Sequence, residues 1–411
     1  MAGPGRALIG EAEQRRVLDV LRGGYVSRYG PEGEPAFTAS VRTLEDAVAQ
    51  RSGVGYAVAT NSGTASLLTI LAGLDIGMGD EVIVPGFTFV ASISAIVYAG
   101  ALPLLAEIDE TLNLDPADVE QRITPRTVAI LAVHMLGNPA RLAELRAIAD
   151  AHDLMLIEDC AQAFGATYRG KPVGSYGIAG AISFNEYKTI TCGDGGMVIT
   201  EDENLYRRCF AFHDQGHEPL RLGSTIGDRP FLGLNFRMTE LQAAVLLAQL
   251  ERLDAIVERL KDHRKAMLEA IGDIPGLTFR RLPDPDGDLA THLVALLPTS
   301  QMAGDVARDL GTKVLADSGW HTYANMEHLL AKRTATNRGC PFHCACHPDE
   351  LRDYRRGMLP RTDDILARAI DIGLGVSDAN LGSSWGVTIK SPRVDIERRG
   401  AMFRGAVTRR L

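Results

Sequence analysis

The chain has 411 residues, of which 45% are hydrophobic and 23% are charged, and its formal net charge is −9. This length allows roughly two to three domains with a sizeable core, and the composition is that of a soluble globular protein. The acidic balance argues against bulk binding of nucleic acid or of an anionic membrane surface, so we expect neither kind of partner. Residues 1–7 lack the apolar run of a signal peptide, and we expect a cytoplasmic protein.

Residues 82–106 carry no charge and are long enough to span a bilayer. Pro85, Gly86, Gly100 and Pro103 interrupt this run and divide it into short segments. We therefore interpret it as a strand, a helix and a second strand, buried in the core of an α/β fold.

The first part of the chain predicts two amphipathic helices, at 11–23 and 38–51, where apolar residues recur at helical spacing. A strand at 56–60 follows, and the small-residue turn 61–66 then leads into a helix that includes 67–71. Such a turn directs main-chain N–H groups and the positive end of the helix dipole at one point, which suits a phosphate. An ordinary N-capped helix is the alternative.

Aromatic side chains follow the buried strand predicted at 81–84. Phe87 and Phe89 come directly after it, at the carboxyl end of a parallel strand, where open α/β sheets bind their ligands. We expect one of them to stack on a planar ring and the other to pack in the core. The next elements are strands at 104–109 and 128–133 and helices at 116–123 and 140–152.

The apolar strand that begins at Leu154 runs into two carboxylates, Glu158 and Asp159. A carboxylate at such a strand end must meet either solvent or a cation. A protonated pyridine nitrogen would match it in charge and in hydrogen bonding. A simple polar strand end is the alternative.

Lys188 stands between the apolar run 180–184 and the turn Gly193-Asp194-Gly195-Gly196, which leads into a second apolar run at 197–200. Burying an ammonium group without a partner is costly. Desolvation lowers a lysine pKa from about 10.4, and the free amine can then attack a carbonyl. Pyridoxal phosphate is the carbonyl cofactor that most often uses such a lysine, as a Schiff base. A surface lysine at the start of a turn is the alternative.

Repeated strand–turn–helix units over residues 1–200 predict an α/β domain with one mostly parallel sheet and helices on both faces. An uninterrupted apolar stripe then predicts one long helix over 239–264, which would link two domains. Past Gly272, short strands alternate with helices, as in a smaller α+β domain. We place a large, cofactor-binding domain at 1–250 and a small C-terminal domain at 251–411.

In order and spacing, these motifs resemble the DegT/DnrJ/EryC1/StrS family of pyridoxal-phosphate-dependent aminotransferases, which have fold type I and mostly act on keto-sugars. The resemblance is good over roughly residues 8–265 and looser beyond. It rests on the motifs at 61–65, 85–92, 158–163, 183–184 before Lys188, 193–196 and 235–244.

The resemblance implies catalytic roles for Lys188, as the Schiff-base lysine that also moves a proton, and for Asp159, as the partner of the pyridine nitrogen. It implies cofactor contacts for further residues: Phe89 on the ring, Gln162 near the ring hydroxyl, and Gly63, Thr64 and Ser183 on the phosphate. Asn235 would reach the phosphate of the neighbouring subunit, in a homodimer with shared active sites. We expect substrate contacts from Tyr187, His321, Tyr323 and Arg361.

The resemblance predicts transfer of an amino group from glutamate or glutamine to a sugar, cyclitol or related polyol that bears a ketone or an aldehyde, as in sugar or antibiotic biosynthesis. The family's sugar dehydratases have His in place of the lysine, so Lys188 argues against them, whereas its aminobenzoate-forming dehydratases keep the lysine. A pyridoxal-phosphate-dependent dehydratase or lyase is therefore one alternative. A non-catalytic ligand-sensing protein is another, and the set of Lys188, Asp159 and Gln162 argues against it.

Two features of the sequence bear on the family resemblance: one departs from the family's usual motif, and the other resembles one branch of the family. The acidic residue in the glycine turn is Asp194, where the family usually has Glu. Residues 355–376 are most similar to the branch of the family that aminates the terminal carbon of an eight-carbon keto sugar acid. Arginines there could bind a carboxylate or phosphate, and a solvated basic face is the alternative.

Three cysteines and two histidines crowd into residues 340–347. Thiolate and imidazole suit zinc, but the spacing of Cys340, Cys344 and Cys346 gives neither two C-x₂-C pairs nor a radical-SAM pattern. We assign no metal and expect a loop over the active site. The other three cysteines are scattered singly through apolar segments, as free thiols of a reduced cytoplasmic protein would be.

Overall fold

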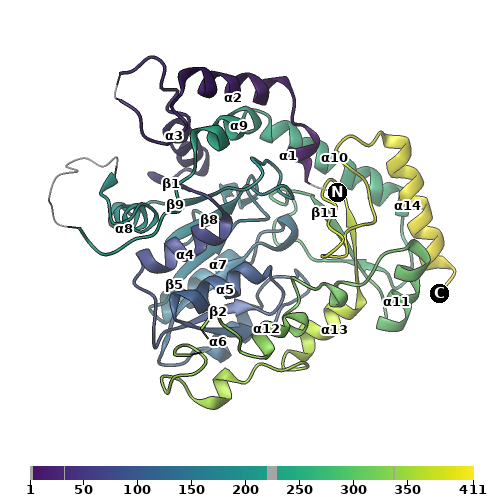
Figure 1. Ribbon diagram of the computed structural model, residues 1–411. Coiled ribbons are helices and arrows are strands. Elements are labelled where there is room, and N and C mark those ends of the chain that lie inside the picture. The colour runs from purple at the N-terminus through teal and green to yellow at the C-terminus, as the bar shows by residue number, and fades with distance from the viewer. Residues whose placement is uncertain (1–2, 32, 220–228, 337) are drawn as a thin grey trace.

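The computed structural model describes residues 3–31, 33–219, 229–336 and 338–411. A seven-stranded sheet lies at the centre of the large domain, in the order β1-β9-β8-β5-β4-β2-β3 (Figure 1). Strand β9 is antiparallel to its neighbours β1 and β8, and the other pairings are parallel. The strands are β1 (Tyr56–Thr60), β2 (Glu81–Pro85), β3 (Leu102–Ala106), β4 (Thr127–Val133), β5 (Met155–Asp159), β8 (Ala179–Ser183) and β9 (Gly196–Thr200).

Helices surround this sheet, as predicted for an α/β fold with a mostly parallel sheet. Among them, α4 contacts β8 and β9 and packs against α5 and α8, whereas α3 contacts β1, β9 and α9. The helices of this part of the chain are α1 (Pro4–Ala7), α2 (Glu11–Gly23), α3 (Ser40–Ser52), α4 (Gly63–Gly73), α5 (Val90–Ala99), α6 (Pro116–Arg122), α7 (Leu142–Ala151) and α8 (Glu203–His213). A short hairpin joins β6 (Thr167–Tyr168) to β7 (Lys171–Pro172).

The uncharged run 82–106 forms β2, α5 and β3, as predicted, and Val82, Ile83 and Val84 are fully buried. Burying such β-branched side chains on both faces of a parallel sheet gives the large domain its core. Among the described helices, none combines the length and the apolar character that a bilayer crossing needs.

The prediction of a single long helix over 239–264 was wrong. The structure has two helices there, α9 (Glu240–Leu250) and α10 (Leu253–Ile271). Thr239 caps α9 in a capping box with Gln242. The chain turns at Glu251 and Arg252, and the Arg252 guanidinium forms an ion pair with Glu13 of α2. This contact with the amino-terminal helix accompanies the break, which no Gly or Pro marks in the sequence.

A smaller α+β domain follows, also as predicted. Its antiparallel sheet has the order β10-β11-β12 and shares a second hydrophobic core with α10, α11 and α14. Buried side chains between residues 315 and 366 instead join the core of the large sheet, so the boundary at residue 250 stays a prediction. The elements are β10 (Thr278–Phe279), β11 (His292–Leu296), α11 (Ser300–Leu310), α12 (Glu327–Leu330), α13 (Pro360–Arg368), β12 (Ala369–Gly373) and α14 (Arg393–Thr408).

Candidate active site

Two adjoining cavities meet at Lys188, which lies in the loop between β8 and β9. The outer cavity has a volume of about 300 Å³ and is also lined by the small domain. The inner cavity, of about 240 Å³, reaches the amino end of α4 and the carboxyl end of β5. Phe89, Gln162, Asn185 and Lys188 line both cavities, so the two form one continuous site.

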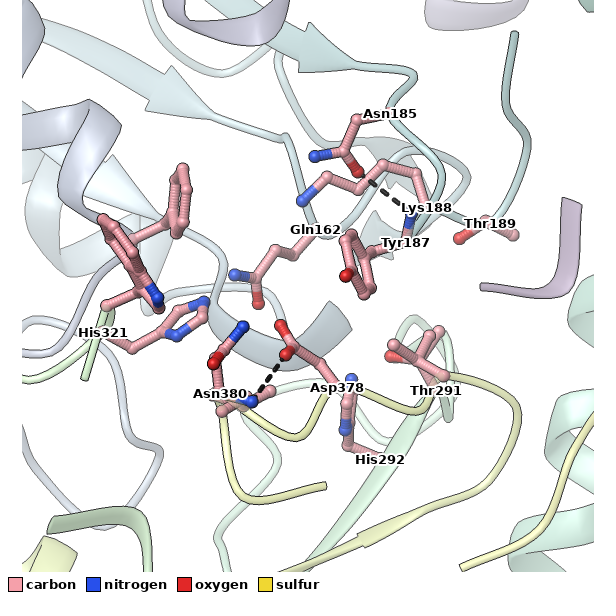
Figure 2. A pocket seen from close by; sticks show the side chains of 14 residues that line it. Gln162, Asn185, Tyr187, Lys188, Thr189, Thr291, His292, His321, Asp378 and Asn380 are labelled. Atoms are coloured by element: carbon pink, nitrogen blue, oxygen red, sulfur yellow. Dashed lines mark hydrogen bonds between the residues drawn. The ribbon is translucent and has the colours of Figure 1, made fainter. Parts of the chain in front are cut away.

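The Lys188 amine points into this site beside Gln162 and Asn185 (Figure 2). Burial lowers the pKa of this amine below its usual value, while the negative charges of Asp159 and Asp378 act in the opposite direction. No hydrogen bond or ion pair joins Lys188 Nζ to another residue in the described ranges. An amine with a lowered pKa and no competing partner is the form of lysine that attacks a carbonyl.

Asp159 ends β5 at the wall of the inner cavity and is only 5% exposed. Its Oδ2 accepts a hydrogen bond of 2.8 Å from the Ser92 hydroxyl of α5, and its Oδ1 accepts one of 3.0 Å from the Ala161 N–H. These two donors hold the carboxylate in one orientation, where it could receive a third hydrogen bond from a ligand in the cavity.

The amino end of α4 forms another wall of the inner cavity. Ser62 caps the helix by accepting from the Ala65 N–H at 3.1 Å. The N–H groups of Gly63 and Thr64 belong to the first helical turn and have no partner within the helix. A Cβ atom at Gly63 would lie 2.7 Å from Ser183 Cβ, so the absence of a side chain keeps this end of the cavity open. The result is a group of N–H and hydroxyl donors at the positive end of a helix.

Phe89 and Gln162 lie on the boundary between the two cavities. Phe89 is 38% exposed, and the centroid of its ring lies 5.3 Å from that of the His321 ring. Phe87, by contrast, is fully buried in the core, as expected for one of the two aromatic side chains, and the stacking of Phe89 on a planar ring stays a prediction. The Oε1 of Gln162 accepts a hydrogen bond of 2.8 Å from the Leu136 N–H, and its amide nitrogen is therefore left as a donor toward the cavity.

The predicted substrate residues fall into two groups. Tyr187 and His321 line the outer cavity. Burial, together with the charge of Lys188, lowers the pKa of His321 to about 3, so its imidazole is neutral near pH 7.

Tyr323 and Arg361 line neither cavity. Tyr323 is fully buried, and its hydroxyl donates to Asp363 at 3.0 Å. The Arg361 guanidinium donates to Asp115 and to the Ile108 carbonyl. The Arg361 side chain therefore holds α13 against the large domain, whereas the Tyr323 hydroxyl joins its own segment to α13.

The outer cavity is also lined by four polar residues of the small domain that the sequence analysis did not single out: Thr291, His292, Asp378 and Asn380. Figure 2 shows them facing Lys188 and Gln162 across the cavity. The Nδ1 of His292 lies 2.8 Å from Oδ2 of the buried Asp371, and Asp378 Oδ1 accepts from the Asn380 N–H at 2.8 Å. The position of His292 directly before the apolar run 293–297 was the one sequence signal for any of them.

Asn235 lies on the surface, outside the lining of both cavities. The neighbouring apolar side chains of Leu232 and Leu234 are exposed, Leu232 to 96%. A role for Asn235 at the phosphate of a second subunit therefore stays a prediction.

The cysteine-rich loop, residues 340–347, does not cover the active site, so the prediction that it lies over the active site was wrong. His347 lies 2.9 Å from Glu81, the first residue of β2, and the Cys346 carbonyl accepts from Arg126, just before β4. The loop therefore packs at the amino ends of these strands, opposite the edge that carries Asp159. Cys160, Cys192 and Cys209 are free thiols, as expected.

Comparisons with known proteins give matches to aminotransferases. The family described as the DegT/DnrJ/EryC1/StrS aminotransferase family matches residues 7–377. An L-glutamine:2-deoxy-scyllo-inosose aminotransferase from Micromonospora echinospora is 36% identical over 334 residues, which cover 77% of this chain and 78% of the relative. A GDP-perosamine synthase from Caulobacter vibrioides is 46% identical over 212 residues, 51% of this chain and 56% of the relative.

A solved structure of 3-amino-5-hydroxybenzoic acid synthase has the same fold, with a TM-score of 0.77 and 26% sequence identity. The match covers 100% of this chain and 100% of the synthase.

Proposed function

This chain belongs to the DegT/DnrJ/EryC1/StrS aminotransferase family and is an aminotransferase; we propose that it uses pyridoxal phosphate to move an amino group from glutamate or glutamine to a sugar, cyclitol or related polyol bearing a ketone or an aldehyde. The observation that carries the proposal is the position of the Lys188 amine. On one side of the amine is the inner cavity, whose wall contains the amino end of α4, which suits an anion, and the Asp159 carboxylate. On the other side is the outer cavity, which is lined by hydrogen-bonding groups.

The inner cavity fits the proposed cofactor group by group. The N–H groups of Gly63 and Thr64, at the start of α4, and the hydroxyl of Ser183, at the end of β8 beside them, would bind its phosphate as donors. Asp159 would pair with the protonated ring nitrogen, and the exposed Phe89 ring would stack on the cofactor ring. Lys188 is the amine that the cofactor aldehyde requires.

Pyridoxal phosphate, when bound, supplies an aldehyde that condenses with amines and a ring that takes up the electrons released at the neighbouring carbon. The chain's own residues do the rest. Lys188, whose pKa burial lowers, can take up a proton from a substrate carbon as a free amine and return it as an ammonium group. The fixed Asp159 carboxylate stabilises positive charge on the ring nitrogen throughout.

The outer cavity would receive the amino donor and then the acceptor. Its lining supplies the Tyr187 hydroxyl, a neutral His321, the Asp378 carboxylate and the Asn380 amide, which can bind several hydroxyl groups of a polyol. Two relatives support an acceptor of this class by their names, which refer to a cyclitol derivative and to a nucleotide-linked sugar.

A homodimer is part of the proposal. Leu232 and Leu234 are exposed beside Asn235, and an apolar surface of this kind is typical of a subunit contact. A partner docked there would bring its own Asn235 toward the phosphate end of the inner cavity.

The test mixes purified protein, pyridoxal phosphate and either L-glutamate or L-glutamine, and follows the cofactor absorbance and the oxo acid formed. The acceptor panel contains a keto-cyclitol, a nucleotide-linked keto-sugar and an eight-carbon keto sugar acid. An aminated product from one of them supports the proposal. Loss of water from an added substrate with no consumption of an amino donor would favour the dehydratase alternative instead.

A further inference from the structure

The loop after Gly339 brings three sulfur atoms together. The Sγ atoms of Cys340, Cys344 and Cys346 all lie within 4.8 Å of one another. Cys340 and Cys344 form a disulfide, and the free thiol of Cys346 lies 3.5 Å from the Cys340 sulfur. Transamination at Lys188 uses none of these groups, since none lines either cavity.

Contacts that do not involve sulfur hold the loop in place. The Arg352 guanidinium donates to the carbonyls of Phe342 at 2.9 Å and Cys344 at 2.8 Å, and Arg126 donates to the Cys346 carbonyl. The Phe342 ring packs edge-on against the buried Tyr354 ring, at 5.7 Å between centroids. Because the main chain is anchored in this way, reduction of the disulfide leaves the three thiols close together.

His347, which follows Cys346 directly, is a second sign of a ligand site. Its Nδ1 lies 2.9 Å from Glu81 Oε1, and both side chains are fully buried. Its Nε2 is also buried, and no described residue bonds to it. A histidine that ligates a metal almost always has its other ring nitrogen bonded to a carboxylate, a main-chain carbonyl or water, and in His347 the carboxylate of Glu81 takes this place.

In the described ranges, His134, Glu158 and Cys160 form a second group of potential metal ligands. This group has no buried ring nitrogen without a partner. The Glu158 carboxylate accepts from the N–H groups of Gly174, Tyr176 and Gly177 and lies 3.0 Å from His134 Nε2. The other ring nitrogen of His134 accepts from the Ala140 N–H. These polar groups already have hydrogen-bond partners, so we interpret the group as a structural hydrogen-bond network.

We propose that the reduced loop is a structural zinc site, in which Cys340, Cys344 and Cys346 are thiolate ligands and His347 Nε2 is the fourth ligand. Thiolates with imidazole form the ligand set that Zn²⁺ prefers. Tetrahedral zinc, with bonds of about 2.3 Å to sulfur, needs sulfur atoms about 3.8 Å apart. The three sulfur atoms already lie within 4.8 Å of one another, whereas His347 lies outside that group and must move its Nε2 toward the sulfur atoms to complete the site.

The chemistry balances with a dithiol reductant. The reductant gives two electrons and two protons to the Cys340–Cys344 disulfide and becomes a disulfide itself. Binding of one Zn²⁺ then releases one proton from each of the three thiols. The disulfide and the zinc site are therefore mutually exclusive states of the same loop.

The test measures metal content and cobalt spectra of the whole chain. Protein kept in a dithiol reductant is incubated with Zn²⁺ alone, freed of unbound metal and analysed by mass spectrometry of the metal. We expect one zinc per chain, and with Co²⁺ alone an absorption band from thiolate to metal. Cys346→Ser and Cys344→Ser should each lower bound zinc at least tenfold, whereas Cys209→Ala, which removes a thiol outside the loop, should keep it.

Oxidation provides the second measurement. A mild thiol oxidant should release the zinc, and the dithiol reductant should restore binding. Reduced wild-type protein without stoichiometric zinc, or equal zinc in Cys346→Ser, would overturn the proposal. Circular dichroism of each variant separates the loss of the site from a failure to fold, and His347→Gln should weaken zinc binding while the thiolate-to-cobalt band remains.

Discussion

The Ser92 hydroxyl donates a hydrogen bond of 2.8 Å to the Asp159 carboxylate, and so joins α5 to the end of β5 inside the inner cavity. Ser92 is itself fully buried, and its Oγ also lies 2.7 Å from the Thr88 Oγ1. Asp159 therefore does not depend on a ligand for its orientation. A carboxylate held in advance in this way costs little reorganisation when a cation arrives.

We predict that Ser92→Ala weakens the binding of pyridoxal phosphate, because one of the two donors that fix Asp159 is lost. A hydrogen bond to a charged group contributes about 1.5–3 kcal/mol, so the Kd should rise roughly ten- to hundredfold. Asp159→Ala should cause a larger loss of both binding and turnover. Cofactor titration by fluorescence checks both variants, and equal affinity of Ser92→Ala and wild type would contradict the role given to the hydroxyl.

The close approach of Gly63 to Ser183 gives a second prediction. A Cβ there would lie 2.7 Å from Ser183 Cβ, in the wall that would bind the phosphate. Forcing extra atoms into a packed site costs about 1–3 kcal/mol, so Gly63→Ala should weaken cofactor binding roughly five- to hundredfold. Gly304→Ala is the matched control, since a Cβ at that helical glycine meets no atom within 4 Å. Similar cofactor affinities for the two variants would count against a phosphate site at Gly63.

Acid stability depends on His321. Burial lowers its folded pKa to about 3 from the ordinary value of 6.5, so between these values the unfolded chain binds a proton that the folded chain does not. The free energy of unfolding therefore falls as the pH decreases from 6.5 toward 3. The shift corresponds to at most about 5 kcal/mol.

His321→Asn should reduce this acid dependence. Urea unfolding of cofactor-free protein at several pH values between 4 and 7, a range chosen from the two pKa values, would measure the slope. His213, whose pKa burial also lowers to about 3, keeps its own contribution in the variant. An unchanged slope in His321→Asn would refute the assignment to His321.

Asp378, in the small domain, contributes a negative charge that acts on the Lys188 amine. Its carboxylate raises the pKa of Lys188 against the effect of burial, so Asp378→Asn should lower that pKa further. In cofactor-free protein, the rate at which an amine-specific acylating reagent modifies Lys188 should then reach its plateau at a lower pH. Asp194→Asn serves as the control, because this carboxylate lines the inner cavity but is not among the charges that raise the pKa of Lys188. A midpoint shifted upward by Asp378→Asn would contradict this account.

Local sequence patterns predicted the sheet of the large domain, and together with the family resemblance they predicted most of the residues that line the inner cavity. The turn at 61–66, the strand end at Asp159 and the lysine after β8 are each contiguous stretches, and the carboxyl edge of a parallel sheet brings them together. The outer cavity depends instead on how the small domain packs. His292 and Asp378 lie on segments far from Lys188 in sequence, and no local pattern predicts which of their side chains face it.

The same limit explains Tyr323 and Arg361. A tyrosine and an arginine near a predicted substrate pocket suit ligand binding, but their partners, Asp363 and Asp115, become neighbours only through tertiary packing. The cysteine loop was misplaced for a related reason. Its anchor Glu81 is a buried carboxylate at the start of β2, and the sequence does not pair it with His347.

The absorbance spectrum of the purified chain with pyridoxal phosphate tests the central claim most directly. Wild type should develop the visible band of a lysine-bound cofactor, and L-glutamate or L-glutamine should bleach it, whereas Lys188→Ala should show the spectrum of free cofactor. Lys171→Ala, which removes an exposed lysine outside both cavities, should behave as wild type. No visible band in wild type, or the same band in Lys188→Ala, would contradict the account.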